Sequence, residues 1–382
     1  MERNTRIRDI ADALGLSIGT VDRALHDRRG VNPMTKARVL QMAKTRGYRP
    51  NPAARLLSSK RRLRISVNLP YQIASFWDLV REGIQEEANL FASSGVDIET
   101  RTFPHLAAGE EAAFEVALAS NVNGIIMATG RPRNLRSLVR KASRSRIPVV
   151  CVATDAPGTE RIGTVSIDSL ISGSMAGELL TRILQGGSKL AVITGDLAIT
   201  DHAEKYQSFQ SAVHSLFPSV QVLEPIQNHE DETEAYEKCR KLLSHHPDLN
   251  GLYISTANST PVFRALEDAG CMGRLTVITT DLFPALARHL ESGAVVATLY
   301  QRPRSQGRFA LRMLLDFIVD GRYPSHQLRL APHLIMKSNL SFYLQRILHE
   351  FEAEGLDGFN EAGAGTSGEH AKSSERSAAP PF

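Results

Sequence analysis

Residues 5–25, TRIRDIADALGLSIGTVDRAL, decide how the rest of the chain is interpreted. The stretch predicts two short helices around a sharp turn at Gly15, because glycine adopts positive φ without steric cost. Thr5 and Ser17 stand where each helix would begin and can cap it. Apolar side chains at helical spacing define the buried face, namely Ile7, Ile10, Ala11, Leu14, Val21, Ala24 and Leu25. The pattern is typical of a DNA-binding helix-turn-helix and is also compatible with an ordinary helical hairpin.

The second helix would turn short or polar residues outward, namely Ile18, Gly19, Thr20, Asp22 and Arg23. A capped helix with such residues in its first turn suits insertion into a DNA major groove. Charge supports this interpretation. Residues 1–64 contain 16 Lys and Arg against 5 Asp and Glu, a net charge of +11, whereas the remainder carries −7. A basic head on an acidic body is the electrostatic pattern of a nucleic-acid-binding head, although any single cluster of charge can also be a solvated surface.

A third helix and a connector follow this stretch. Asn32 and Pro33 begin the helix, since asparagine is a good N-cap and proline is favoured at the first helical position. Residues 48–64, YRPNPAARLLSSKRRLR, lack the apolar periodicity of a domain. They are either a plain linker or a hinge that folds into a short helix on DNA and offers an apolar wedge to the minor groove.

Residues 5–64 resemble the headpiece of the LacI/GalR family of bacterial transcription regulators. The motifs are IADALGLSIGTVDRAL at 10–25 and VNPMTKARVLQMAKTRGYRPNPAARLL at 31–57. The resemblance implies base contacts from Ile18, Gly19 and Arg23. It also implies phosphate contacts from Thr5, Ser17, Thr20, Thr35 and Tyr48, and a minor-groove wedge at Leu57 beside Ala54. Asp22 replaces the serine of the family pattern, where it would accept from a cytosine amino group or pair with Arg23 or Arg28.

From Ile65 onward the sequence alternates short apolar strands with amphipathic helices, which predicts an α/β fold with parallel sheets covered on both faces. The pattern restarts after residues 163–168, so two similar halves are expected. Within the second half we expect a helix over 205–217 and a strand over 220–225, and near the end a helix over 308–321. A small ligand would bind in the cleft between the halves, at the carboxyl ends of the strands.

The body, from residue 65 to about 344, resembles the periplasmic-binding-protein-like sensor of LacI/GalR regulators, nearest the ribose-binding-like type. The motifs are SFWDLVREGI at 75–84, ATDAP at 153–157, TTDLFPALARHLESG at 279–293 and VVATLYQRPRSQG at 295–307. The resemblance implies that the ligand stacks on Phe76 and Trp77. It also implies polar contacts from Asp155, Lys205, Asn258, Asp281 and Gln301. A sugar, sugar acid or polyol is the expected effector.

Signatures of catalysis are missing from the sequence. It has no dinucleotide fingerprint after the first strand, and no P-loop, zinc-protease HExxH or nucleophile elbow, so we expect no enzyme activity, no cofactor and no metal site. The three cysteines lack disulfide or metal spacing and should be small buried or incidental residues. His202, His245 and His246 are expected on surface loops. Without a signal peptide or an apolar span, we expect a cytoplasmic protein.

The sequence therefore predicts a helix-turn-helix domain at 1–47, a hinge helix and linker at 48–64, a two-lobed ligand-binding and dimerisation domain at 65–345 and a mostly disordered tail at 346–382. The expected function is ligand-responsive control of transcription, as the probable repressor of a carbohydrate or polyol operon. The expected partners are a second copy of the chain and pseudo-palindromic double-stranded operator DNA. The alternative is a cytoplasmic small-molecule-binding protein of the sugar-binding transport type, with no regulatory role.

Overall fold

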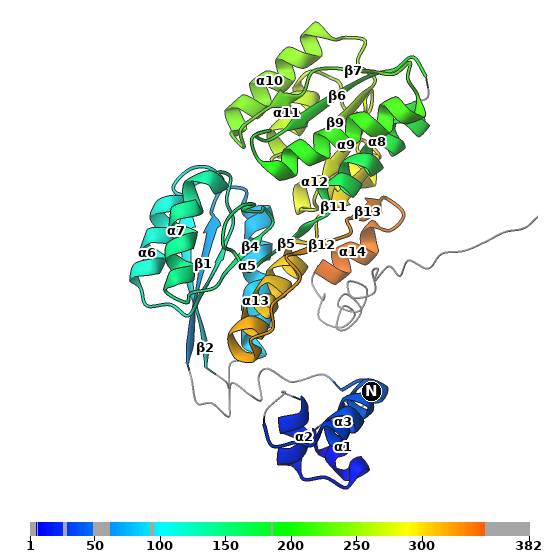
Figure 1. Ribbon diagram of the computed structural model, residues 1–382. Coiled ribbons are helices and arrows are strands. Elements are labelled where there is room, and N and C mark those ends of the chain that lie inside the picture. Colours follow the sequence, from blue (N-terminus) through cyan, green and yellow to red (C-terminus); the bar gives the residue numbers. More distant parts are fainter. Residues whose placement is uncertain are drawn as a thin grey trace, which may run out of the picture.

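The computed structural model describes residues 5, 7–25, 29–48, 62–91, 95–184 and 186–347. It contains a small helical head and a body of two α/β lobes (Figure 1). The expected hinge helix, with Ala54 and Leu57, lies outside the described residues, and so does the tail from 348 onward. No helix in the described part of the chain is long and apolar enough to cross a membrane.

The head is built from α1 (Ile7–Leu14), α2 (Ile18–Leu25) and α3 (Pro33–Thr45). Gly15 has φ +64°, and the hydroxyl of Ser17 accepts from the backbone N–H of Thr20 at 3.1 Å, as the sequence predicted for a turn and a cap. Asn32 caps α3 by accepting from Met34 N at 2.8 Å. The helices enclose a small apolar core of Ile10, Ala11, Val21, Ala24, Val39 and Ala43.

The first lobe holds a parallel sheet in the order β12-β5-β4-β3-β1-β2. Its strands are β1 (Leu63–Pro70), β2 (Val96–Phe103), β3 (Gly124–Met127), β4 (Val149–Val152), β5 (Gly163–Ile167) and β12 (Gln327–Leu330). Apolar side chains of α5 (Ala74–Asn89) and α13 (Pro303–Asp320) pack on one face. Those of α6 (Glu110–Ala119) and α7 (Pro132–Arg144) pack on the other, which gives the expected sheet covered on both sides.

The second lobe repeats this plan with the strand order β13-β11-β10-β9-β6-β7. Its strands are β6 (Lys189–Thr194), β7 (Gln221–Val222), β8 (Ile226–Gln227), β9 (Gly251–Ile254), β10 (Thr276–Thr280), β11 (Ala297–Tyr300) and β13 (His333–Met336), of which β13 is antiparallel to β11. One face is covered by α8 (Ser169–Leu184) and α9 (Thr200–Leu216). The other is covered by α10 (Glu232–His245), α11 (Thr260–Asp268), α12 (Pro284–Ser292) and α14 (Leu340–Ile347).

Three expected elements differ in extent. The strand expected over 220–225 is split into β7 and β8, which pair with opposite ends of β6, with Pro225, which has no N–H to donate, between them. Helix α13 begins at Pro303 rather than 308. Helix α9 begins at Thr200 rather than 205, because Thr200 and Asp201 form its first turn. The earlier start of α9 places four further polar residues, Thr200, Asp201, His202 and Glu204, on a helix that borders the cleft.

Within the described residues the backbone passes between the lobes three times, at 167–169, 300–303 and 330–333. Arg302 lies in the second crossover and has φ +57°, a left-handed conformation that a non-glycine residue adopts only when its surroundings hold it there. The body is therefore two lobes connected by three short backbone segments. The carboxyl ends of the β-strands border the space between the lobes (Figure 1).

Candidate functional site

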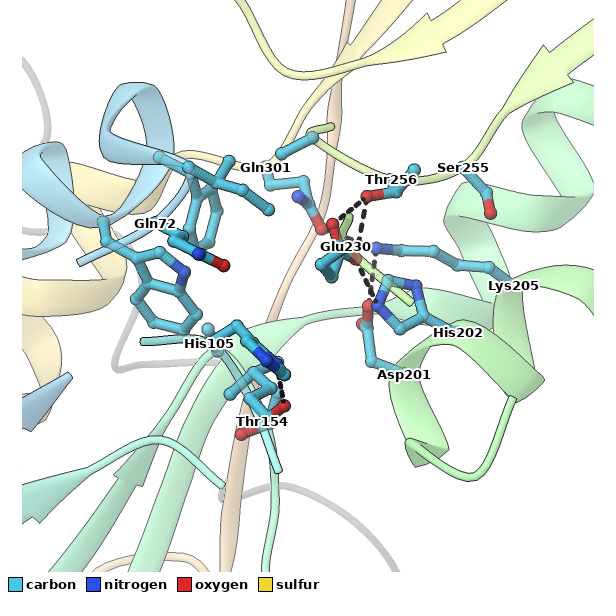
Figure 2. A pocket seen from close by; sticks show the side chains of 16 residues that line it. Gln72, His105, Thr154, Asp201, His202, Lys205, Glu230, Ser255, Thr256 and Gln301 are labelled. Carbon is cyan, nitrogen blue, oxygen red and sulfur yellow. Dashed lines mark hydrogen bonds and ion pairs between the residues drawn. The ribbon is translucent and has the colours of Figure 1, made fainter. Parts of the chain in front are cut away.

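A pocket opens between the two lobes, and Figure 2 shows their side chains facing each other across it. The first lobe contributes residues that follow β1, β2 and β4, and the second contributes α9 and the residues that follow β8, β9 and β11. The full lining is Gln72, Ile73, Phe76, Trp77, His105, Leu106, Ala153, Thr154, Asp201, His202, Lys205, Glu230, Ser255, Thr256, Ala257 and Gln301. A ligand in this pocket would touch both lobes at once.

The wall from the first lobe is mainly aromatic and apolar. Phe76 and Trp77 lie in the first turn of α5, and their side chains are almost fully buried. Their rings meet edge to face, with centroids 4.9 Å apart and planes at 90°. Both expected aromatic residues therefore line the pocket, where they provide apolar surface from the first lobe.

The wall from the second lobe is charged and internally paired. Lys205 is 1% exposed, and its ammonium group donates to Asp201 Oδ2 at 2.7 Å and to Gln301 Oε1 at 2.6 Å. Ser169 donates to the other oxygen of Asp201. Burial raises the pKa of Asp201, but the charges of Lys205 and His202, with the hydrogen bonds from Lys205 and Ser169, outweigh it, so the pKa lies below its ordinary value. Asp201 is therefore ionised at neutral pH.

A second pair, His202 and Glu230, stands beside the first. His202 Nε2 lies 3.1 Å from Glu230 Oε1, and Thr256 Oγ1 donates to both carboxylate oxygens at 2.8 Å. Gly195 makes this arrangement possible, because a Cβ there would lie 2.5 Å from His202 Nε2 and closer still to Glu230. The prediction that His202 lies on a surface loop is wrong, since the early start of α9 carries it into the pocket wall.

Asp281 lies behind the pocket surface. It does not line the pocket, but its carboxylate accepts from Gln301 N at 3.1 Å and from Gln301 Nε2 at 2.7 Å. Burial raises the pKa of Asp281 to about 6, against the opposing effect of the bonds from Gln301. The structure therefore joins three of the expected ligand residues, Lys205, Gln301 and Asp281, in one hydrogen-bonded chain.

Asp155 lies outside the pocket, unlike the neighbouring Thr154. Its carboxylate accepts from Arg161 Nη2 at 2.6 Å and from Gln327 Nε2 at 3.0 Å, and Thr164 also donates to it. Burial raises the pKa of Asp155, but the hydrogen bonds from Arg161 and Thr164 outweigh it and the net pKa is lowered. The expectation that Asp155 lines the ligand site is therefore corrected. Its carboxylate binds Thr164 of β5 and Gln327 of β12, and so links these two strands instead of facing the cleft.

Several pocket residues escaped the sequence interpretation. Gln72 follows β1, His105 follows β2, and Ser255 and Thr256 follow β9. The rule that ligands lie at the carboxyl ends of parallel strands contains the signal that would have found them. Glu230 follows the short β8 and has φ +61°, a conformation that the sequence does not reveal.

The residues expected to contact DNA bases lie on α2. Ile18 is 52% exposed, and Gly19 and Arg23 are also exposed on α2. Ser17 and Thr20 hydroxyls lie 2.8 Å apart, and Arg23 Nη2 reaches Thr20 Oγ1 at 3.5 Å. Asp22, Thr35 and Tyr48 are half-buried. The side chains of α2 thus form a compact polar surface beside an exposed isoleucine.

Thr5 differs from the expected helix cap. Its hydroxyl donates to the carbonyl of Arg46, 2.7 Å away and just past the end of α3. The Arg46 guanidinium in turn donates to the carbonyl of Asp9 at 3.3 Å. Thr5 therefore joins the beginning of the head to its last helix, which satisfies a carbonyl that the end of a helix leaves free.

Comparison with known proteins assigns both parts of the chain. Residues 65–322 match the model of the periplasmic binding protein domain family, and residues 6–51 match that of the bacterial regulatory proteins of the lacI family. The chain is 24% identical over 265 residues to catabolite control protein A of Staphylococcus epidermidis, covering 69% of this chain and 78% of that protein. It is 26% identical over 343 residues to the transcriptional regulator AglR of Rhizobium meliloti, covering 87% and 93%.

Solved structures match the body. GanP, a glucose-galactose binding protein from Geobacillus stearothermophilus, superposes with a TM-score of 0.66 at 26% identity, covering 73% of this chain and 99% of GanP. A solute-binding protein from Burkholderia graminis, solved in complex with D-arabinose, has a TM-score of 0.68 at 22% identity and covers 73% and 96%. The second likeness supports the fold of the two lobes.

Proposed function

Since this chain belongs to the periplasmic binding protein domain family and carries a DNA-binding head of the lacI family, it is a ligand-responsive transcriptional regulator, and we propose that its effector is an uncharged sugar or polyol. The observation that carries the proposal is the pocket between the lobes. Its aromatic wall suits the face of a ring, and its polar wall offers donors and acceptors to hydroxyl groups.

Charge selects against an acidic effector. Among the described residues of the lining, Asp201 and Glu230 carry carboxylates and Lys205 an ammonium group that is bound to Asp201. A sugar acid would bring another negative charge into a wall that already has an excess of carboxylates. Lys205 also lacks the planar fork with which arginine grips a carboxylate. A neutral sugar or polyol avoids both costs.

The proposed mechanism couples closure of the pocket to DNA. Because Gln301 lines the pocket and precedes the crossover at Arg302, a ligand that binds both walls changes the angle between the lobes. In a homodimer this change would alter the spacing of the two heads and of the hinge residues Ala54 and Leu57. Coupling of about 1–3 kcal/mol is typical of such systems. We propose a cytoplasmic homodimeric repressor that binds a pseudo-palindromic operator and catalyses no reaction.

The single tryptophan provides the test. Trp77 lines the pocket, so binding of D-glucose, D-galactose or myo-inositol should change its fluorescence and raise the melting temperature by mass action. The same ligand should change the affinity for DNA selected from a random library by about 5–150-fold. A saccharide that changes the fluorescence but leaves DNA affinity unaltered would contradict the regulatory coupling. Conversion of the bound sugar to another compound would instead indicate an enzyme.

A further inference from the structure

A second cavity adjoins the pocket, and we name it the outer chamber. It has a volume of about 530 Å³. Its lining is Tyr71, Gln72, Ile73, Ala74, Ser75, Glu230, Asp231, Glu232, Thr233, Ala257, Asn258 and Thr260. Gln72, Ile73, Glu230 and Ala257 line both cavities, so the two share a wall. Figure 2 shows Gln72 and Glu230 on opposite sides of the cleft.

The beginnings of three helices supply hydrogen-bond donors to the outer chamber. Its lining includes the first residues of α5, α10 and α11. The first backbone N–H groups of a helix have no partner within the helix. Asp231 satisfies one of them in α10, at 2.7 Å from Glu234 N, whereas α5 and α11 have no side-chain cap bond. Carboxylates of Glu230 and Glu232 offer acceptors in the same space.

Asn258 is an independent sign of a ligand in the outer chamber. Its side chain is 6% exposed, and none of the described residues offers a hydrogen-bond partner to its Nδ2 atom. The backbone of the residue is held in place, because its N–H donates to Thr256 Oγ1 at 3.1 Å and Thr256 donates to Glu230. A buried donor without a partner is costly, so a buried amide in a cavity wall indicates that a ligand supplies its acceptor.

The chemistry of the lining defines the group that fits. None of the described residues around the outer chamber carries a positive charge, and three carry carboxylates, which disfavours a phosphate or an acidic sugar. Tyr71 is 52% exposed and presents an aromatic ring to the same space. Mixed donors and acceptors beside an aromatic face suit a neutral, hydroxyl-rich ring. The volume lies within the range of small-molecule pockets.

We propose that the effector is a disaccharide or a glycoside, with one ring between the walls of the pocket and a second uncharged, hydroxyl-rich ring in the outer chamber. The inference rests on the proposed function, because it assigns the size of the same effector. Tyr71 and Asn258 would then determine specificity for the second ring, and the residues around Trp77 and Lys205 would bind the first.

The test compares matched saccharides by the fluorescence of Trp77. D-glucose is compared with maltose and cellobiose, and D-galactose with lactose and melibiose. At least one disaccharide should bind about tenfold or more tightly than either of its component monosaccharides. Tyr71→Ala should reduce this preference to within about twofold while leaving the monosaccharide Kd unchanged. Asn258→Ala should also reduce the preference for the disaccharide over the monosaccharide. Tyr323→Ala, at an exposed tyrosine that lines neither cavity, is the matched control and should preserve the full preference.

The outcomes separate this inference from the proposed function. If monosaccharides bind and no disaccharide binds more tightly, the second ring site is wrong and the effector is a single sugar. Equal weakening of monosaccharide and disaccharide binding by Tyr71→Ala would likewise overturn it. If no saccharide of either size changes the fluorescence of Trp77 or the melting temperature, the proposed effector class fails, and this inference fails with it.

Discussion

The ammonium group of Lys205 lies 2.6 Å from the side-chain oxygen of Gln301, and this contact joins the pocket to the connection between the lobes. Lys205 belongs to α9 in the second lobe, whereas Gln301 stands at the crossover that leads into α13 of the first. Gln301 also donates to Asp281, so the chain of contacts runs from Asp201 to Asp281. A ligand that displaces either partner therefore acts directly on the backbone that connects the lobes.

Lys205→Met should lower the free energy of unfolding by about 3–5 kcal/mol at pH 7, because it leaves Asp201 as a buried charge without its counter-ion. The folded-state pKa of Asp201 is lowered, so the stability gained from the pair is present above the unfolded pKa of about 3.9 and is lost as pH falls further. Urea unfolding at pH 7 and pH 3.5 measures this. Lys205→Arg, which keeps the charge, is the control. If Lys205→Met lowers the free energy of unfolding equally at both pH values, the pairing of Lys205 with Asp201 is contradicted.

The raised pKa of Asp281 predicts that stability depends on pH in the opposite direction. Its pKa is raised to about 6 in the folded protein from an ordinary 3.8, so its contribution to stability is full below pH 3.8 and is lost as pH rises through 6. A shift of this size corresponds to about 3 kcal/mol. Urea unfolding at intervals between pH 4 and pH 7 should show this loss in the native chain and not in Asp281→Asn. Parallel curves for the two proteins would show that Asp281 does not titrate in this range.

Gly195→Ala should weaken effector binding by displacing the His202–Glu230 pair, since the added Cβ would lie 2.5 Å from His202 Nε2. Overpacking of this kind typically costs about 1–3 kcal/mol of stability. Isothermal titration with the effector, together with thermal unfolding, separates the two effects. Gly186→Ala is a matched exchange in the same lobe, where the Cβ would meet the Ser219 hydroxyl at 3.1 Å, and it should preserve binding.

Asp155→Asn should destabilise the first lobe and leave the effector Kd within about twofold. The substitution removes a charged acceptor from Arg161, at a cost of about 1.5–3 kcal/mol. Urea unfolding measures the first effect and Trp77 fluorescence the second. A tenfold loss of effector affinity at unchanged stability would instead place Asp155 among the ligand contacts, as the sequence resemblance implied.

Ser17→Ala should destabilise the head by about 1 kcal/mol, because it removes the cap on the N–H of Thr20. Fluorescence anisotropy should then show weaker DNA binding with an unaltered effector Kd. Ser143→Ala, inside α7 of the body, provides the control for a serine far from the head in sequence. Unchanged DNA affinity would mean that Ser17 neither caps α2 nor contacts a phosphate.

Much of the fold could be predicted because it depends on local patterns. The apolar spacing of Ile10, Val21 and Val39 predicts the core of the head, and Gly15 predicts its turn. The alternation of strands and helices predicts both lobes. The split between β7 and β8 was missed, although Pro225, which has no N–H to donate, marks where the pairing with β6 is interrupted.

The site could be predicted from the residues themselves where the local order of strand and helix fixes a side chain's position. Phe76 and Trp77 follow a strand and begin a helix, so their place at the cleft follows from order in the chain. The direction of Asp155 depends on Gln327, which arrives from 172 residues later in the sequence. His202 was misplaced because the first turn of α9 has weak apolar periodicity, although Thr200 and Asp201 are typical of a helix beginning.

The three passages of backbone between the lobes also limit how this chain can be recombined. The first lobe needs residues 63–167 together with 303–330, so an exchange with a relative at one junction would separate α13 and β12 from the sheet that they complete. The second lobe needs β13 and α14 in addition to residues 169–300 for the same reason. New effector preferences are therefore accessible through single substitutions in the cleft or through paired exchanges, whereas the contiguous head can be transferred in one piece.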